Sequence, residues 1–320
     1  MIENRQGPTR DGVESAARRI EGWVTRTPLL PFEWRGRRLW AKAECLQQGG
    51  AFKLRGATNR LLQLSEDERK RGVVAFSSGN HARGVAIAAR RLNVSATIVM
   101  PSDAPAVKRE ATAAEGAAIV LFDRARDDRV AIAARISDET GAIVVPSFDD
   151  IDIIEGQGTA GVEIGEQLGG EPPLVVVPCG GGGLSSGIAL ALPGSTIVPV
   201  EPAGWDDMAK SLERGEIVPV EAGAPSTKLD ALQTPIVSPF TFGVLQERGA
   251  RGLSVSDEEA FAAMRFAFDT LRLVVEPGGA AALAALLADK IADVPEGSVV
   301  LLSGGNVDPG LYASVLNGAA

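Results

Sequence analysis

Histidine is nearly absent from this chain of 320 residues, in which it occurs once, as His81. A Ser–His–Asp triad would have to use that residue, and a metal site with two histidines is excluded within one chain. Cysteine occurs twice, as Cys45 and Cys179, with no CxxC pair. Two thiols do not form a disulfide framework, so we expect both to be reduced and the protein to be cytoplasmic.

Long apolar runs and an excess of positive charge are missing as well. No run of 18 apolar residues is present, so no membrane span is expected. The opening sequence MIENRQGPTRDG lacks the basic and apolar regions of a signal peptide. The net charge is −9, and only seven residues are lysine, which argues against nucleic acid as a partner. A small anionic ligand is still compatible with this charge, because a single site can be locally positive.

Short β-branched runs alternate with amphipathic stretches from residue 73 onward. This alternation predicts an α/β fold with parallel sheets flanked by helices. The strands form two groups, which indicates two lobes with a ligand cleft between them. The expected strands are 73–76, 95–100, 118–122, 142–145, 174–178, 196–200 and 298–302. The expected helices are about 81–92, 105–115, 126–140, 155–168, 184–192, 257–272 and 279–292.

A run of four glycines, Gly180 to Gly183, follows the apolar segment LVVVPC and precedes an Ala- and Leu-rich segment. A loop between a strand and a helix start offers free backbone N–H groups and the positive end of the helix dipole, which favours an anion. A tight turn explains one or two glycines but fits four poorly. No Lys-Ser/Thr follows, and Ser185 and Ser186 break the G-x-G-x-x-G spacing, so a single phosphate is favoured over a dinucleotide.

Two further loops follow expected strands. SSGNH at 77–81 brings together hydroxyl, amide and glycine groups that suit a carboxylate, although any one of them is also an ordinary helix cap. SGGN at 303–306 follows the last strand, so that Ser303 points into the same cleft; the alternative is a plain turn.

Lys53 lies in the apolar stretch GGAFKLRGA, unlike the other six lysines. Burial among apolar neighbours lowers the pKa of a lysine and makes its amine nucleophilic at neutral pH, whereas an arbitrary lysine is usually solvated. A phosphate loop, a carboxylate loop and a lysine that can form a Schiff base with an aldehyde together suggest pyridoxal 5′-phosphate.

The ordered set of motifs resembles the fold-type II pyridoxal-phosphate enzymes, in the serine/threonine dehydratase and serine racemase family. The segments GGAFKLRGA, SSGNHARGVA, PCGGGGLSSG, VEPAGWDD, VVEPGGAAALAA and LSGGN carry the resemblance, which covers roughly residues 25–308. It implies a two-domain fold like the tryptophan synthase β subunit, a homodimer, and an active site in the interdomain cleft. The large cofactor-binding domain would comprise residues 1–46 and 147–320, and the small substrate-loop domain residues 47–146.

The resemblance also implies roles for individual residues. Lys53 would hold the cofactor and move the Cα proton, with Phe52 beside the ring. Asn80 would bond the 3-oxygen of the ring, and Ser303 would contact the pyridine nitrogen. Backbone N–H groups would bind the phosphate, and they belong to Gly180, Gly181, Gly182, Gly183 and Leu184.

The substrate carboxylate would lie in the loop 77–81, among Ser77, Ser78, Gly79, Asn80 and His81. Ser78 matches the position that acts as an acid or base on the face opposite the lysine. In part of the family, the segment EPAGWDD binds Mg²⁺ or Ca²⁺, which here implies the Glu201 and Asp207 carboxylates with the Trp205 carbonyl. A solvated acidic turn with a helix cap is the alternative.

Some positions depart from the family pattern. Ala51 stands where serine is usual, and Arg83 stands where glutamine is common. Arg83 could select a substrate with a second carboxylate, such as 3-hydroxyaspartate, or it could point to solvent.

The sequence therefore predicts a pyridoxal-phosphate-dependent ammonia-lyase that converts a β-hydroxy amino acid to a 2-keto acid and ammonia, with L-threonine or L-serine as the first candidates. A serine racemase or a threo-3-hydroxyaspartate dehydratase is the alternative within the family. Outside it, the same glycine loop would suit a non-catalytic binder of a phosphorylated metabolite. The expected partner is a small amino acid, with no nucleic acid and no membrane.

Overall fold

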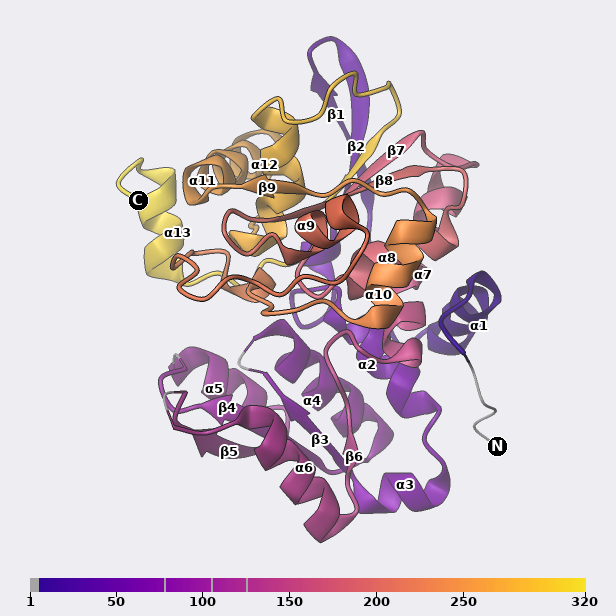
Figure 1. Cartoon of the computed structure of the whole chain (residues 1–320), viewed down its shortest axis with the longest axis vertical. Coiled ribbons are helices and arrows are strands. Elements are labelled where there is room, and N and C mark those ends of the chain that lie inside the picture. Colours follow the sequence, from indigo (N-terminus) through magenta and orange to yellow (C-terminus); the bar gives the residue numbers. More distant parts are fainter. Residues whose placement is uncertain (1–5, 78, 105, 125) are drawn as a thin grey trace.

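The computed structural model describes residues 6–77, 79–104, 106–124 and 126–320, which form two β-sheets flanked by helices (Figure 1). The six-stranded sheet lies in the upper half of the view and the four-stranded sheet in the lower half. The predicted α/β class is confirmed. No helix in these ranges is long and apolar enough to cross a membrane.

The large sheet has the strand order β1-β2-β10-β7-β8-β9, in which only the β1–β2 hairpin is antiparallel. Its strands are β1 (Leu29–Trp34), β2 (Arg37–Lys42), β7 (Leu174–Pro178), β8 (Thr196–Pro202), β9 (Leu253–Val255) and β10 (Val299–Leu301).

Helices cover both faces of the large sheet, because β7 buries alternate side chains on opposite sides. Val176 packs in the cluster that includes α11 and α12, whereas Val175 and Val177 pack in the cluster that includes α7, α8 and α10. These helices are α7 (Ile151–Leu168), α8 (Gly183–Ala191), α10 (Pro239–Glu247), α11 (Asp257–Phe266) and α12 (Ala281–Leu287).

The small sheet is entirely parallel, with the order β5-β4-β3-β6. Its strands are β3 (Val73–Phe76), β4 (Ala96–Pro101), β5 (Ala118–Phe122) and β6 (Ile143–Val144), and its helices are α2 (Lys53–Leu62), α3 (Glu66–Arg71), α4 (Asn80–Leu92), α5 (Ala106–Ala113) and α6 (Arg129–Thr140). One core cluster packs α2 and α4 against this sheet, and a second packs α6 on its other face.

Every strand predicted from residue 73 onward is present, with ends shifted by at most two residues. The hairpin β1–β2, the short strand β9 and the helices α1 (Arg10–Ile20), α2, α3, α9 (Asp207–Arg214), α10 and α13 (Pro309–Leu316) were not predicted. The predicted helix 257–272 ends at Phe266 and continues as a π-helical turn, Ala267–Leu271. The strands of the small sheet all lie between residues 73 and 144, whereas β1 and β2 of the large sheet precede them and its other strands follow them. The limits of the two domains stay a prediction.

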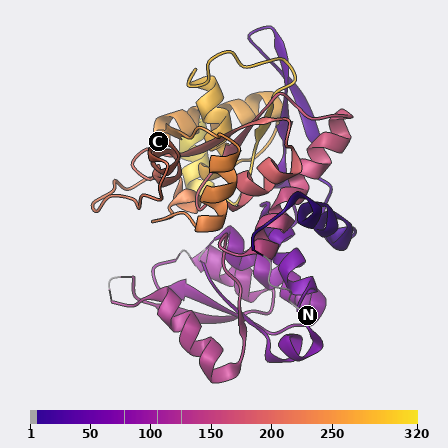
Figure 2. The same cartoon turned by 45° about the vertical axis from the view of Figure 1, so that its right-hand side comes forward.

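Helix α2 lies where the two halves of the molecule meet (Figures 1 and 2). It packs against α4 on one side and α7 on the other. A Cβ atom added to Gly156 would lie 2.6 Å from the Cα of Gly56, and one added to Gly84 would lie 3.1 Å from the carbonyl carbon of Lys53. These glycines allow close contact between helices, and they place the first turn of α2 between the two sheets.

Candidate active site

Lys53 is the first residue of α2, and its amine is buried. Its Nζ donates a hydrogen bond to the backbone carbonyl of Ser147 at 2.8 Å and lies 5.1 Å from the centroid of the Phe52 ring. Burial lowers the pKa of Lys53 to about 8. At pH 7 about a tenth of this amine is therefore uncharged, far more than of a solvated lysine, and the uncharged amine is the form that acts as a nucleophile or base.

The four glycines connect β7 to α8, and each one faces protein atoms where a side chain would begin. A Cβ atom on Gly181 would lie 2.3 Å from the ring of Phe148, and one on Gly183 would lie 3.1 Å from the Phe148 Cβ. Gly182 has a φ of +87° and would meet the Met208 side chain. Packing against neighbouring residues, above all Phe148, is therefore a sufficient reason for glycine at these positions. Close approach of a ligand is not needed to explain it.

The backbone N–H groups of the glycine loop, rather than its lack of side chains, support the prediction of an anion site. In the parts of the chain that the structure covers, no backbone carbonyl accepts a hydrogen bond from the N–H of any residue from 180 to 184, and the N–H of Gly182 interacts with the Cys179 thiol. The first intrahelical bond runs from the N–H of Ser186 to the carbonyl of Gly182. The N–H groups of Gly180, Gly181, Gly183 and Leu184, at the positive end of α8, form a cradle for a phosphate-sized anion.

Residues 147 and 148 connect this cradle to the lysine. The carbonyl of Ser147 accepts the hydrogen bond from Lys53, and the ring of Phe148 lies against the glycine loop. Neither residue was predicted to take part in the site. Their sequence, PSF after a short strand, carries no signal that distinguishes it from an ordinary loop.

The loop that ends at Asn80 meets the loop that begins at Ser303. The Asn80 amide contacts Glu276 and Asn306, and the carbonyl of Ser303 accepts a hydrogen bond of 3.1 Å from the N–H of Phe52. Ser303 is buried, and this hydrogen bond places its backbone beside Phe52, the residue that precedes Lys53. The structure thus brings together the predicted residues of the lysine, asparagine and serine segments.

The other predicted residues of the loop 77–81 differ in what they offer. Ser77 Oγ accepts from the N–H of Gly79 at 3.2 Å, and Ser78 lies outside the described residues. His81 is buried, and its Nε2 pairs with the carbonyl of Val145 at 2.9 Å. Burial lowers the pKa of His81 to about 3, so the ring is neutral, and its Nδ1 is buried without a hydrogen-bond partner among the described residues.

Arg83 is half-buried and its guanidinium turns toward Asn306. Its Nη1 donates to Asn306 Oδ1 at 3.1 Å, and its Nε is buried without a hydrogen-bond partner in the described part of the chain. Glu276, which sits in the quoted motif VVEPGGAAALAA, was given no role by the sequence analysis. It is buried, and burial raises its pKa to about 7.

The residues predicted to bind a cation lie at the start of α9. Glu201 accepts hydrogen bonds from the N–H groups of Met208 and Ala209 at 2.9 and 2.8 Å, and both oxygens of Asp207 are buried without a hydrogen-bond partner among the described residues. The Trp205 indole donates to the carbonyl of Pro225. Within the same residues no group of three or more His, Cys, Asp or Glu side chains could hold a metal, so backbone carbonyls and water would have to complete a site.

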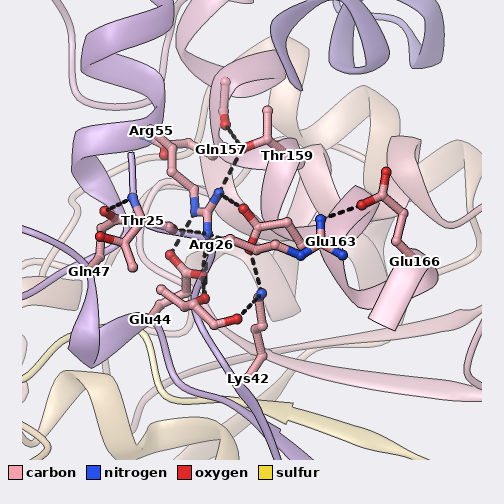
Figure 3. A network of polar contacts seen from close by, with 12 residues as sticks. Thr25, Arg26, Lys42, Glu44, Gln47, Arg55, Gln157, Thr159, Glu163 and Glu166 are labelled. Atoms are coloured by element: carbon pink, nitrogen blue, oxygen red, sulfur yellow. Dashed lines mark hydrogen bonds and ion pairs between the residues drawn. The ribbon is translucent and has the colours of Figure 1, made fainter. Parts of the chain in front are cut away.

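A network of buried charges lies behind the first turn of α2 (Figure 3). Arg55 is fully buried and forms hydrogen bonds of 2.7–2.8 Å with Glu44 and Glu163. Lys42 is also fully buried and donates to Glu163 at 2.6 Å. Two cations and two carboxylates balance, and together they fix the turn that carries Lys53 to the large sheet and α7.

Comparison with known proteins adds a family assignment. A protein-family model described as "Pyridoxal-phosphate dependent enzyme" matches residues 20–305. The chain is 41% identical to L-threo-3-hydroxyaspartate ammonia-lyase of Saccharomyces cerevisiae over 97% of both chains, and 39% identical to serine racemase of Schizosaccharomyces pombe over 99% of this chain and 100% of that one. The structure of maize serine racemase superposes with a TM-score of 0.90 at 35% identity, covering 98% of each chain.

Proposed function

The chain belongs to the pyridoxal-phosphate dependent enzyme family, and on that basis we propose that it is an ammonia-lyase for a β-hydroxy amino acid. The buried amine of Lys53, next to a cradle of free backbone donors, is the observation that carries the proposal. A non-catalytic binder of a phosphorylated metabolite would have no use for a lysine whose pKa is lowered to about 8.

The residues present fit pyridoxal phosphate. The N–H groups of residues 180–184 would hold its phosphate, Lys53 its aldehyde carbon, and Asn80 and Ser303 the polar atoms of its ring. The bound cofactor supplies a sink for the negative charge that develops at the substrate Cα. All of these groups come from loops and helix starts where the two sheets meet.

Groups of the protein itself would then perform two tasks. The backbone donors at the start of α4 would hold the substrate carboxylate, which fixes the Cα atom. Lys53 Nζ would take the Cα proton, because its lowered pKa brings the amine close to the pH at which a general base works best. Loss of the β-hydroxyl group and hydrolysis of the released enamine would give a 2-keto acid and ammonia.

Among the candidate substrates we favour L-threo-3-hydroxyaspartate over L-threonine and L-serine. Arg83 is held inside the site by Asn306 and keeps a buried Nε without a partner in the described chain. A guanidinium at this place can pair with the second carboxylate of that substrate. The relative from S. cerevisiae bears the name of the same activity. Racemisation of serine is the second candidate, since serine racemases are among the relatives. We further expect a homodimer in the cytoplasm.

The divalent cation belongs to the same proposal. Glu201 and Asp207 are two buried carboxylates side by side, and burial raises the pKa of both. The charge of Asp207 raises the pKa of Glu201 further. Mg²⁺ or Ca²⁺ bound to these oxygens, with the Trp205 carbonyl and water, would neutralise them.

A substrate panel tests the proposal. Purified enzyme with added pyridoxal phosphate is assayed with L-threo-3-hydroxyaspartate, L-threonine, L-serine and D-serine, and keto acid, ammonia and the opposite enantiomer are all measured. We expect keto acid and ammonia in equal amounts, fastest from hydroxyaspartate. Lys53→Ala should remove turnover and leave a folded protein. Failure of the purified protein to bind pyridoxal phosphate, or substantial ammonia release by Lys53→Ala, would contradict the mechanism.

Arg83→Gln tests the substrate preference. Glutamine keeps a donor for Asn306 but loses the positive charge, so kcat/KM for hydroxyaspartate should fall at least about ten-fold more than kcat/KM for L-threonine. Equal losses for the two substrates would show that Arg83 does not recognise a second carboxylate.

A further inference from the structure

The side-chain amide of Asn80 is held from both ends. Its Nδ2 donates a hydrogen bond of 2.5 Å to Glu276 Oε1, and its Oδ1 accepts one of 2.8 Å from Asn306 Nδ2. An amide has one oxygen and one NH₂ group, so these two bonds exclude the flipped orientation. One N–H of Nδ2 is used by Glu276, and the other is left for a ligand.

Glu276 is built into this position. Its backbone N–H donates to the carbonyl of Gly304, and its own carbonyl accepts from the N–H of Ala280. A Cβ atom on Gly304 would lie 2.0 Å from Glu276 Oε1 and 3.0 Å from Asn80 Nδ2. Glycine at position 304 therefore makes room for the contact between the carboxylate and the amide.

Asn306 is fixed in the same way. Its Nδ2 also donates to the carbonyl of Gly49 at 2.7 Å, and its Oδ1 accepts from Arg83 Nη1 at 3.1 Å. A Cβ atom on Gly50 would lie 2.4 Å from Asn306 Oδ1. These hydrogen bonds form one continuous series, Arg83–Asn306–Asn80–Glu276, with a cation at one end and a carboxyl group at the other.

This series of hydrogen bonds connects the two halves of the molecule. Asn80 and Arg83 stand in the first turn of α4, which packs on the small sheet. Glu276 and Asn306 stand on loops of the half that contains the large sheet, 196 and 226 residues further along the sequence than Asn80.

We propose that Glu276 and Asn306 are positioning residues that hold the Asn80 amide in one orientation, with its second N–H presented to the 3-oxygen of the cofactor ring. This inference rests on the proposed function, since it names the cofactor that Asn80 serves. The hydrogen bond that Asn306 donates to the Asn80 oxygen polarises the amide and strengthens its N–H donors. An amide that Glu276 and Asn306 already hold in place loses less entropy when the ligand binds.

The simplest alternative is that these contacts only connect the two halves of the molecule. In that case, the Glu276→Ala substitution lowers stability, and its effect on cofactor affinity is the same whether residue 80 is asparagine or alanine. A double-mutant cycle separates the two roles, because it measures whether the effect of one residue depends on the other.

The experiment titrates pyridoxal phosphate into the cofactor-free forms of wild type, Asn80→Ala, Glu276→Ala and the double variant, and follows visible absorbance. We expect each single variant to bind about ten-fold more weakly, and the double variant to bind no more weakly than Asn80→Ala. Thermal unfolding checks that each variant is folded. Unchanged affinity in Glu276→Ala, or losses that multiply in the double variant, would overturn the inference. A wild type that does not bind pyridoxal phosphate would instead overturn the proposed function.

Two more variants keep the test decisive if Glu276→Ala is unstable. Glu276→Gln retains an oxygen that can accept from Asn80, so its affinity at pH 8 should lie within about three-fold of wild type. Gly304→Ala displaces the carboxylate without removing it and should weaken binding about as much as Glu276→Ala. Normal affinity in Gly304→Ala would contradict the positioning role.

The pH dependence provides a second readout. The charged and titratable groups around Glu276 are Asp230, Lys108 and the thiol of Cys45, and burial is the largest influence on its pKa of about 7. Protonation below pH 7 weakens the acceptor for Asn80. The affinity ratio of wild type to Glu276→Gln should therefore fall between pH 8 and pH 6, and a constant ratio would count against the inference.

Discussion

Two groups of buried charge in this molecule are organised in opposite ways. In the network around Arg55, two cations meet two carboxylates, and every hydrogen bond between a cation and a carboxylate lies between 2.6 and 2.8 Å. Glu201 and Asp207 are buried to the same degree, but they face each other. The nearby Lys210 pairs with Asp206, at 3.2 Å, and with no oxygen of Asp207. One group carries its own counterions, and the other needs a proton or a cation from solution.

The pKa values follow this difference. Burial alone raises the pKa of Glu44, but Arg55, Lys42 and Thr27 together outweigh burial, and the net shift is downward. Burial raises the pKa of Asp207 to about 7 and that of Glu201 well above its usual value, and no cation opposes it. The comparison teaches that burial by itself does not decide ionisation; the partners that the fold supplies decide it.

Replacement of Arg55 by methionine should have the largest effect on this comparison. Methionine fills part of the volume but leaves Glu44 and Glu163 without their main partner in a buried place. Breaking one partner of such a cluster costs about 3–5 kcal/mol, so the free energy of unfolding measured with urea should fall by that amount. A loss below 1 kcal/mol would mean that water or another cation already compensates the carboxylates.

Arg26→Met is the matched control, because Arg26 pairs with Glu166 beside the same network in Figure 3. The two side chains of this pair are 52% and 56% exposed. Exposed ion pairs contribute about 0–1 kcal/mol. Similar losses for Arg26→Met and Arg55→Met would contradict the distinction between the buried network and its surroundings.

The sequence predicted Lys53 and the glycine loop because their signals are local. Apolar neighbours surround the lysine, and the order of strand, glycines and helix indicates a helix start with free donors. It also predicted the strands from residue 73 onward. The hairpin β1–β2 was missed because it lies before the region where strands and helices alternate regularly.

The rest of the site depends on contacts between distant segments. Glu276 and Asn306 reach Asn80 across 196 and 226 residues, and no periodicity records such a pairing. The sequence SSGNH does not reveal which of its side chains are bonded within the protein, so the contact of the His81 ring with the Val145 carbonyl could not be predicted. Phe148 supplies a reason for the bare glycines that only the folded chain can show.

Addition of a divalent cation should have the second largest effect on the free energy of unfolding, and it should act through the pair Glu201 and Asp207 alone. At pH 8, Mg²⁺ at a hundred times its dissociation constant should raise the free energy of unfolding by about 2.7 kcal/mol. Asp207→Asn should abolish this gain, whereas Glu33→Gln, an exposed carboxylate on β1, should retain it. Equal gains in wild type and Asp207→Asn would place the cation elsewhere.

The smallest effect concerns pH in the presence of a chelator. The pKa of Asp207 is about 7 in the folded protein, against 3.8 for an ordinary aspartate. The unfolded chain therefore loses this proton near pH 4 and the folded chain near pH 7, so the folded state binds more protons in between. Its contribution to stability is complete below pH 4 and is lost as the pH rises through 7.

Between pH 6 and pH 8 the free energy of unfolding should consequently fall by about 1 kcal/mol more in wild type than in Asp207→Asn. The network around Arg55 should not contribute to this difference. The lowered pKa of Glu44 means that its stabilisation is present above pH 4.5 and is lost only as the pH falls below that value. Urea unfolding of both proteins at pH 6, 7 and 8 measures the difference. A wild type that gains stability over Asp207→Asn toward pH 8, with the chelator present, would mean that a cation of the protein neutralises the pair after all.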